Sequence, residues 1–202
     1  MKTSNKFTLV RIVSAPFFFV LYFLPLWFHA ENGSLLSIIT TCILIPSLAF
    51  AEFTDFLDGH FARKNNEVGD FGKMFDPFAD VFLHLSLFTC FTFTGYCPLP
   101  VLVLVIYREF AQNFLRMIAA KKGVAIAARK GGKLKTVFYI TSILISLAIE
   151  SLARTGLADG WGLDLSAART VNVCFYVASV VFSYVSFFDY LKSFGHLLKE
   201  DV

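Results

Sequence analysis

Residues 51–82, AEFTDFLDGHFARKNNEVGDFGKMFDPFADVF, place four of their five aspartates in strongly apolar surroundings. They are Asp55, Asp58, Asp76 and Asp80. A carboxylate at the centre of a bilayer costs about 2.5–3.5 kcal/mol on insertion scales. A chain that keeps four carboxylates together among Phe, Leu and Ala is therefore expected to use them. Their oxygens are the ligands that hard divalent cations prefer.

The composition favours an integral membrane protein over a soluble one. Of 202 residues, 56% are hydrophobic, only 16% are charged and 25 are Phe, and the mean hydropathy is +0.66. Ordinary soluble domains carry about 25% charged residues. The length allows about six spans of ~20 residues with short loops. We therefore predict an all-α polytopic membrane protein with one membrane domain over residues 1–202, with no nucleic-acid partner.

Hydropathy marks six candidate transmembrane helices along the chain. They run over residues 7–28, 34–57, 74–94, 98–119, 134–153 and 170–191. If both termini and the second and fourth loops share a side, that side and its helix ends hold all the Lys and Arg residues except Arg154 and Arg169. The positive-inside rule then predicts that both termini and the aspartate segment face the cytoplasm.

The spacing of the aspartates predicts two facing pairs. Asp55 and Asp58 are three residues apart near the end of the second span, so they share a helix face. Asp76 and Asp80 are four apart at the start of the third span and share a face as well. Four convergent carboxylates suit one or two Mg²⁺-like ions. Two such ions a few Å apart can clamp the attacking and leaving oxygens of a phosphoryl transfer.

Small residues accompany the aspartates at fixed spacing. Gly59, Ala62 and Gly72 have little or no side chain, so a pyrophosphate or a planar group can approach the backbone there. Arg63 offers a planar fork for phosphate oxygens. A single glycine here would be interpreted as a turn signal, but the whole set favours a nucleotide site.

The segment resembles the CDP-alcohol phosphatidyltransferase family. The pattern Asp55-x2-Asp58-Gly59-x2-Ala62-Arg63-x8-Gly72-x3-Asp76-x3-Asp80 matches the family signature at all eight fixed positions. The opening Asn5-x2-Thr8-x2-Arg11, the segment YREFAQNFLR and the segment GKLKT are similar to a bacterial branch that uses glycerol 3-phosphate. One departure is Val81, because that branch usually has Lys directly after the fourth aspartate.

The resemblance implies a reaction, partners and a location. Family members transfer a phosphatidyl group from CDP-diacylglycerol to an alcohol and release CMP. It implies that Asp55, Asp58 and Asp76 are core ligands of two Mg²⁺ or Mn²⁺ ions, and that Asp80 touches the second ion and is the general base. It further implies a CDP-diacylglycerol site lined by Gly59, Ala62, Arg63 and Gly72. On the same ground we expect a homodimer that lies in the membrane lipid and is located in the bacterial cytoplasmic membrane.

An acceptor that carries its own phosphate needs cations. The candidates on the cytoplasmic side are Arg108, Arg116, Lys133 and Lys135. Arg108 follows the apolar run VLVLVIY, so it must snorkel, pair with Glu109 or face a polar cavity. The lysines of the basic loop can equally serve only as a membrane-surface anchor.

Two alternative functions are open at this point. A sister enzyme would use inositol phosphate, serine or a phospholipid as acceptor, and Val81 together with the divergent last third of the chain leaves room for it. A cation transporter would use the aspartates as a permeation site, but such sites usually lie near the midplane of the membrane.

Overall fold

The computed structural model describes residues 3–64, 70–124, 126 and 130–201, and this part of the chain is helical. Six long helices and two short elements follow one another. They are α1 (Thr3–Trp27), α2 (Leu35–Lys64), α3 (Asp70–Phe93), α4 (Leu99–Lys121), α5 (Lys130–Arg154), α6 (Leu157–Gly160), α7 (Ser166–Phe194) and the 3₁₀ segment η1 (Gly195–Asp201).

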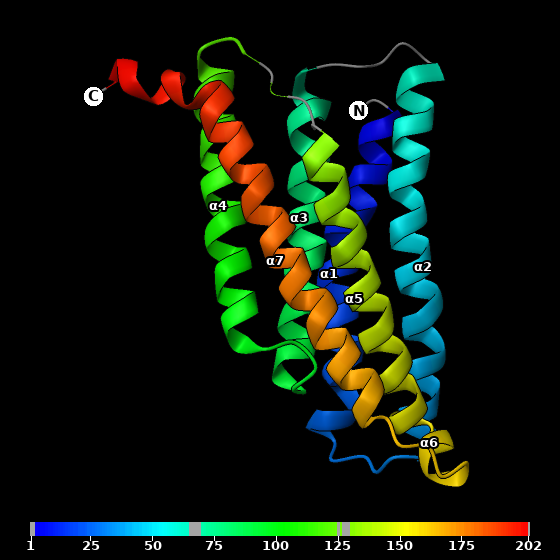
Figure 1. Cartoon of the computed structure of the whole chain (residues 1–202). Coiled ribbons are helices and arrows are strands. Elements are labelled where there is room, and N and C mark those ends of the chain that lie inside the picture. The colour runs from blue at the N-terminus through cyan, green and yellow to red at the C-terminus, as the bar shows by residue number, and fades with distance from the viewer. Residues whose placement is uncertain (1–2, 65–69, 125, 127–129, 202) are drawn as a thin grey trace.

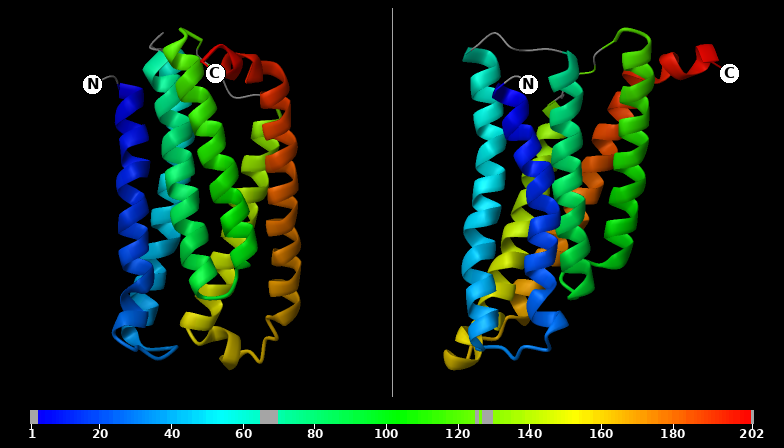
Figure 2. Two further views of the ribbon diagram at one scale, coloured as in Figure 1. Left: turned by 90° about the vertical axis from the view of Figure 1, so that its left-hand side faces the viewer. Right: turned by 180° about the vertical axis from the view of Figure 1, so that it is seen from behind.

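The long helices form one bundle with two distinct ends (Figure 1). The start of α1, the end of α2, the start of α3, the end of α4, the start of α5 and η1 lie toward one end, which we call the motif end (Figures 1 and 2). The α3–α4 turn and α6 lie toward the other, the far end. Helix α1 packs against α2 and α3, α5 packs against α7, and α4 packs against α7 and α3.

Local sequence explains where α4 begins and ends. Gly95 adopts φ 81°, a left-handed conformation that glycine tolerates, and it reverses the chain after α3. Pro98 in an extended conformation then precedes the first turn of α4, where a missing N–H costs nothing. Gly123, at φ 75°, follows α4 directly, so a glycine in the left-handed conformation also ends this helix.

The interior combines a large apolar cluster with buried polar side chains, some of them, such as Ser142 and Ser179, in the middle of their helices. The main core cluster joins α1, α2, α3, α4, α5 and α7 through residues such as Phe18, Leu48, Leu87, Val105 and Ile143. A smaller cluster at the motif end contains Leu115, Ala119, Tyr190 and Leu197.

The outer surface is apolar on every long helix, as expected of a protein in lipid. Examples are Val13, Ile43, Phe82 and Val181, each more than 40% exposed. Among the described residues, five helices are long and apolar enough to cross a membrane: α1, α2, α3, α5 and α7. Helix α4 carries Arg108, Glu109 and Arg116 and is not among these five.

The prediction of an all-helical chain is confirmed, but the helix bounds differ from those expected. The second and third spans were expected over residues 34–57 and 74–94, whereas α2 continues to Lys64 and α3 starts at Asp70. Residues of good helix propensity, including Ala62, Arg63 and Lys64, extend α2 beyond its apolar part. Hydropathy therefore marked where the chain leaves the apolar layer and not where the helix ends.

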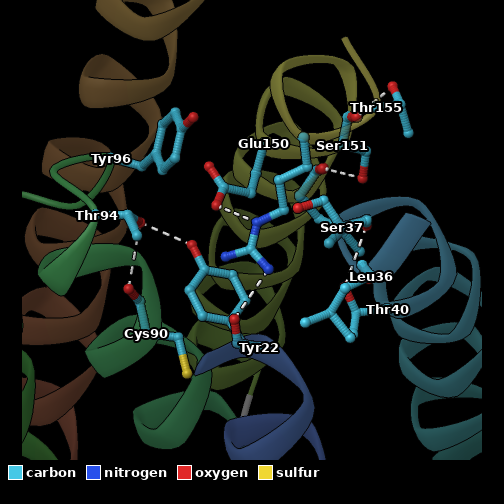
Figure 3. A network of polar contacts seen from close by, with 12 residues as sticks. Tyr22, Leu36, Ser37, Thr40, Cys90, Thr94, Tyr96, Glu150, Ser151 and Thr155 are labelled. Atoms are coloured by element: carbon cyan, nitrogen blue, oxygen red, sulfur yellow. Dashed lines mark hydrogen bonds and ion pairs between the residues drawn. The ribbon is translucent and has the colours of Figure 1, made fainter. Parts of the chain in front are cut away.

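A buried network ties three helices together toward the far end (Figure 3). The Arg154 Nε donates to Glu150 Oε1 at 2.5 Å and its Nη1 donates to the Tyr22 carbonyl at 2.9 Å. The Arg154 guanidinium also lies 4.3 Å from the centre of the Tyr22 ring. The Tyr22 hydroxyl shares a hydrogen bond of 2.7 Å with Thr94 Oγ1. We call Tyr22, Thr94, Glu150 and Arg154 the Arg154 cluster.

Candidate active site

Three of the four motif aspartates converge on one arginine of α1. Arg11 Nη1 donates to Asp55 Oδ1 of α2, and the same nitrogen donates to Asp80 Oδ1 of α3 at 2.7 Å. Its Nη2 lies 3.9 Å from Asp76 Oδ1. The arginine side chain is only 1% exposed, whereas the aspartates are 52% (Asp55), 35% (Asp76) and 33% (Asp80) exposed. The carboxylates therefore form a rim that solvent reaches, with a buried cation beneath it.

Thr8 completes this group from the same helix face as Arg11. Its hydroxyl donates to Asp76 Oδ1 at 2.6 Å, and the three-residue spacing puts both side chains on one side of α1. We call Thr8, Arg11, Asp55, Asp76 and Asp80 the aspartate cluster. The convergence of α2 and α3 was predicted from spacing, but the roles of Thr8 and Arg11 were not.

The remaining motif positions lie on the same two helices. Asp58, Gly59, Ala62 and Arg63 belong to the last turns of α2, and their side-chain positions lie outside the described part. Gly72 is half-buried in the first turn of α3. The predicted pairing of Asp55 with Asp58 is thus not tested by the contacts, whereas Asp76 and Asp80 do share a partner.

The oxygen-rich donor set fits a hard cation in its chemistry. Asp55, Asp76 and Asp80 come from two helices, and a positive side chain already lies among them. Within the described residues, no three His, Cys, Asp or Glu side chains are arranged around a common metal position. Seating an ion between these carboxylates therefore requires the Arg11 guanidinium to shift aside or to share them.

A second acid lies one turn deeper, beside the aspartate cluster. Glu52, three residues before Asp55, places Oε1 3.3 Å from Nε2 of His84, four residues after Asp80. The His84 ring meets the Tyr139 ring edge-on, with centroids 6.0 Å apart. This contact connects the aspartate cluster to a further polar group between α4 and α5.

That further group is built around the buried carboxylate of Glu109 on α4. Arg108 Nη1 donates to Glu109 Oε2 at 2.9 Å, and Lys135 Nζ and the Tyr139 hydroxyl donate to Oε1 at 2.7 and 3.1 Å. Arg108 Nε also donates to the Ser183 carbonyl of α7 at 3.1 Å. We call Arg108, Glu109, Lys135 and Tyr139 the Glu109 cluster. Of the expected alternatives for Arg108, the structure shows pairing with Glu109.

The other two acceptor candidates differ in their surroundings. Arg116 is half-buried, with its guanidinium 5.9 Å from the centre of the Tyr190 ring, and its Nε has no hydrogen-bond partner in the described part of the chain. It also interacts electrostatically with Lys135. Lys133 is exposed. The structure thus brings Arg108, Arg116 and Lys135 together and leaves Lys133 at the surface.

A sequence model of the CDP-alcohol phosphatidyltransferases matches residues 1–185. The chain belongs to this family. Its relatives include the CDP-diacylglycerol–glycerol-3-phosphate 3-phosphatidyltransferases of Treponema pallidum (38% identity, over 98% of this chain and 92% of the relative), Bacillus subtilis (32%, over 96% of each) and Aquifex aeolicus (27%, over 99% and 100%). The similarity to these phosphatidyltransferases therefore covers nearly the whole chain.

Family membership links the three aspartates of the aspartate cluster to the family signature. All eight signature positions of this phosphatidyltransferase lie on α2 and α3. Arg11 was missed as a site residue, although a signal was present, because an arginine inside an apolar segment needs a buried partner. The acids of the signature were expected at the same end of the neighbouring spans. Arg11 was counted as a positive charge near the cytoplasmic side and as part of the Asn5-x2-Thr8-x2-Arg11 pattern, without a role in the site.

Proposed function

We propose that this chain is a phosphatidylglycerophosphate synthase. It transfers the phosphatidyl group of CDP-diacylglycerol to glycerol 3-phosphate, giving phosphatidylglycerophosphate and CMP. The observation that carries the proposal is the convergence of Asp55, Asp76 and Asp80 on one guanidinium, that of Arg11. The relatives are named as glycerol-3-phosphate 3-phosphatidyltransferases, and one of them is 38% identical over 98% of this chain, which supports this acceptor.

Asp55, Asp58, Asp76 and Asp80 would hold two Mg²⁺ or Mn²⁺ ions. Metal ions held there would supply polarisation of the donor's phosphate oxygens and stabilisation of the charge that develops on them. The Arg11 guanidinium holds three of these carboxylates in place from beneath. The protein thus preorganises the acids before the donor arrives, which reduces the reorganisation needed during the reaction.

The reaction itself needs one base and one leaving group. Asp80 takes the proton of the attacking hydroxyl of glycerol 3-phosphate. The hydroxyl oxygen forms a bond to the phosphorus of the phosphatidyl group, the bond from that phosphorus to the bridging oxygen breaks, and CMP leaves with the electron pair. Gly59, Ala62 and Gly72 let the cytidine diphosphate approach α2 and α3, and Arg63 binds its phosphates.

The acceptor phosphate binds the cations between α4 and α5. Arg108 and Lys135 share one buried carboxylate, Glu109, and Arg116 interacts electrostatically with Lys135, so this region carries surplus positive charge. Arg116 presents a guanidinium nitrogen that has no hydrogen-bond partner among the described residues. Lys133, exposed nearby on the first turns of α5, assists electrostatically from the rim.

Helix α4 is the sixth membrane span of a single membrane domain over residues 1–202. Its charged residues Arg108 and Glu109 are buried, while its exposed residues include Phe110, Phe114 and Met117. A helix with this distribution presents an apolar surface to lipid although its mean hydropathy is low. With six spans, both termini and the active site face the cytoplasm of a bacterium, as the positions of the Lys and Arg residues favour.

A second candidate is a sister enzyme with another acceptor, and one observation favours it. Val81 stands where the glycerol 3-phosphate branch usually has Lys, and its side chain is buried, 8% exposed. The cations of the Glu109 cluster favour a phosphorylated acceptor over serine, which leaves inositol phosphate as the main competitor. Family membership gives no support to a cation transporter.

The test is release of CMP by purified protein with Mg²⁺, CDP-diacylglycerol and a panel of acceptors. We expect release with glycerol 3-phosphate and not with inositol phosphate, serine or a phospholipid. Release with inositol phosphate alone would overturn the choice of acceptor, and no release with any acceptor would overturn the enzyme assignment. The homodimer that the family resemblance implies is tested by the mass of the protein in detergent.

A further inference from the structure

One buried amide on α4 has no hydrogen-bond partner. Gln112 is 0% exposed, and neither its Nε2 nor its Oε1 is paired within the described structure. Leaving such a group unpaired costs about 1–3 kcal/mol. A ligand that pairs with both atoms would remove this cost.

The place of Gln112 on α4 points to the acceptor region. It lies four residues after Arg108 and four before Arg116, so the three side chains share one helix face. Arg108 is already paired with Glu109, whereas Arg116 Nε is unpaired like the amide. This face of α4 therefore carries Arg108 and Arg116 with the uncharged Gln112 between them.

Gln112 also lies at the depth of the proposed general base. With a rise of 1.5 Å per residue, it lies roughly 14 Å from the end of α4 at Lys121, and Asp80 roughly 15 Å from the start of α3 at Asp70. Both of these helix ends are at the motif end, and α3 packs against α4 (Figure 1). Gln112 and Asp80 therefore lie at a similar level on neighbouring helices.

We propose that Gln112 recognises the secondary hydroxyl of glycerol 3-phosphate, which makes it a specificity-determining residue. This rests on the proposed function. The primary hydroxyl attacks and faces Asp80, and the phosphate binds Arg116 and Lys135, so the secondary hydroxyl is the polar group left over. It donates to Gln112 Oε1 and accepts from Nε2, which pairs both atoms. A neutral amide suits a hydroxyl in this way, whereas a phosphate is bound by the cations.

The test compares two acceptors in the wild-type protein and in Gln112→Met. The second acceptor is 3-hydroxypropyl phosphate, which keeps the attacking hydroxyl and the phosphate but lacks the secondary hydroxyl. We expect the wild type to prefer glycerol 3-phosphate in kcat/KM, because its buried amide is left unpaired by the analogue. In Gln112→Met we expect kcat/KM for glycerol 3-phosphate to fall about tenfold, with that for the analogue unchanged, so that the preference disappears.

Two further measurements keep the test decisive. Where the analogue turns over too slowly, its inhibition constant against glycerol 3-phosphate replaces kcat/KM in the comparison. Gln112→Asn, which keeps an amide, serves if Gln112→Met does not fold, and it should retain part of the preference. The control is Asn172→Leu, which removes another fully buried amide, one bonded to Ser146 on α5, and should leave the preference intact.

The outcomes separate this proposal from the proposed function. No CMP release from wild-type protein with glycerol 3-phosphate contradicts the function itself. If the wild type is active and Gln112→Met lowers kcat/KM for both acceptors equally, or lowers only thermal stability, the amide has a structural role and the proposal fails.

Discussion

Arg154 and Arg11 are buried arginines at opposite ends of the bundle, and each contacts acids in a different way. Arg154 at the far end has one acid partner, Glu150, whose side chain is only 10% exposed, and a backbone carbonyl and the Tyr22 ring complete its surroundings. Arg11 at the motif end has three aspartates, all at least 33% exposed. The first is a closed structural pair with matched charges. The second leaves surplus negative charge facing solvent, which is what a site for cations requires.

The largest expected effect is the loss of catalysis when an aspartate at the motif end is replaced. Asp80→Asn keeps the size of the side chain but removes the proposed base, so kcat should fall about 10²–10⁴-fold while binding of CDP-diacylglycerol is largely kept. Steady-state rates of CMP release and binding of the donor to the purified variant measure this. Equal loss of turnover and donor binding would make Asp80 mainly a ligand of the metal.

At the far end we expect a substitution to lower stability and to leave catalysis unchanged. Arg154→Met leaves the Glu150 carboxylate buried without its partner, so the free energy of unfolding should fall by about 3–5 kcal/mol. The kcat and KM of the folded fraction should stay unchanged. Thermal unfolding in detergent and the assay of CMP release test the two parts, with the double variant Glu150→Gln/Arg154→Met regaining stability. Loss of kcat in correctly folded Arg154→Met would mean that the two ends are coupled.

Replacing the arginine at the motif end should produce a loss that depends on metal. In Arg11→Met the three aspartates repel one another without their cation, and stability should fall by about 1–3 kcal/mol when Mg²⁺ is absent. Added Mg²⁺ should restore more stability to this variant than it adds to the wild type, because a ligand of the folded state stabilises it by mass action. A Tm loss that is the same with and without Mg²⁺ would count against shared use of these carboxylates.

The smallest expected effect is a difference in KM between variants of two lysines on α5. Lys135 bonds Glu109 and lies close to Arg116, whereas Lys133 is exposed. Lys135→Met should raise the KM for glycerol 3-phosphate about tenfold, as expected for loss of a charged hydrogen bond. Lys133→Met should change it less than about twofold, because exposed charges contribute little. Equal changes in both variants would instead favour a membrane-anchoring role for this basic segment.

The sequence predicted the parts of this molecule that depend on local pattern. Apolar segments located the six long helices, and the spacing of Asp76 and Asp80 correctly put both on one face. The expected second span ended at residue 57, because hydropathy reports only the apolar part of a helix, whereas α2 continues to Lys64.

Partners from distant segments were the part that the sequence left open. Arg11 meets aspartates 44–69 residues away along the chain, and Lys135 meets Glu109 from another helix. Such contacts depend on how the helices pack, which periodicity does not specify. Gln112 gave no signal at all, because only the finished bundle shows that its amide is buried and unpaired.

The most direct test of the contrast between the two ends is the binding of Mn²⁺, measured by electron paramagnetic resonance on the purified protein. We predict that the wild type binds Mn²⁺, that Asp76→Asn loses this binding, and that Glu150→Gln keeps it at the wild-type stoichiometry. Unchanged Mn²⁺ binding in Asp76→Asn, or its loss in folded Glu150→Gln, would contradict the assignment of the aspartate cluster as the cation site.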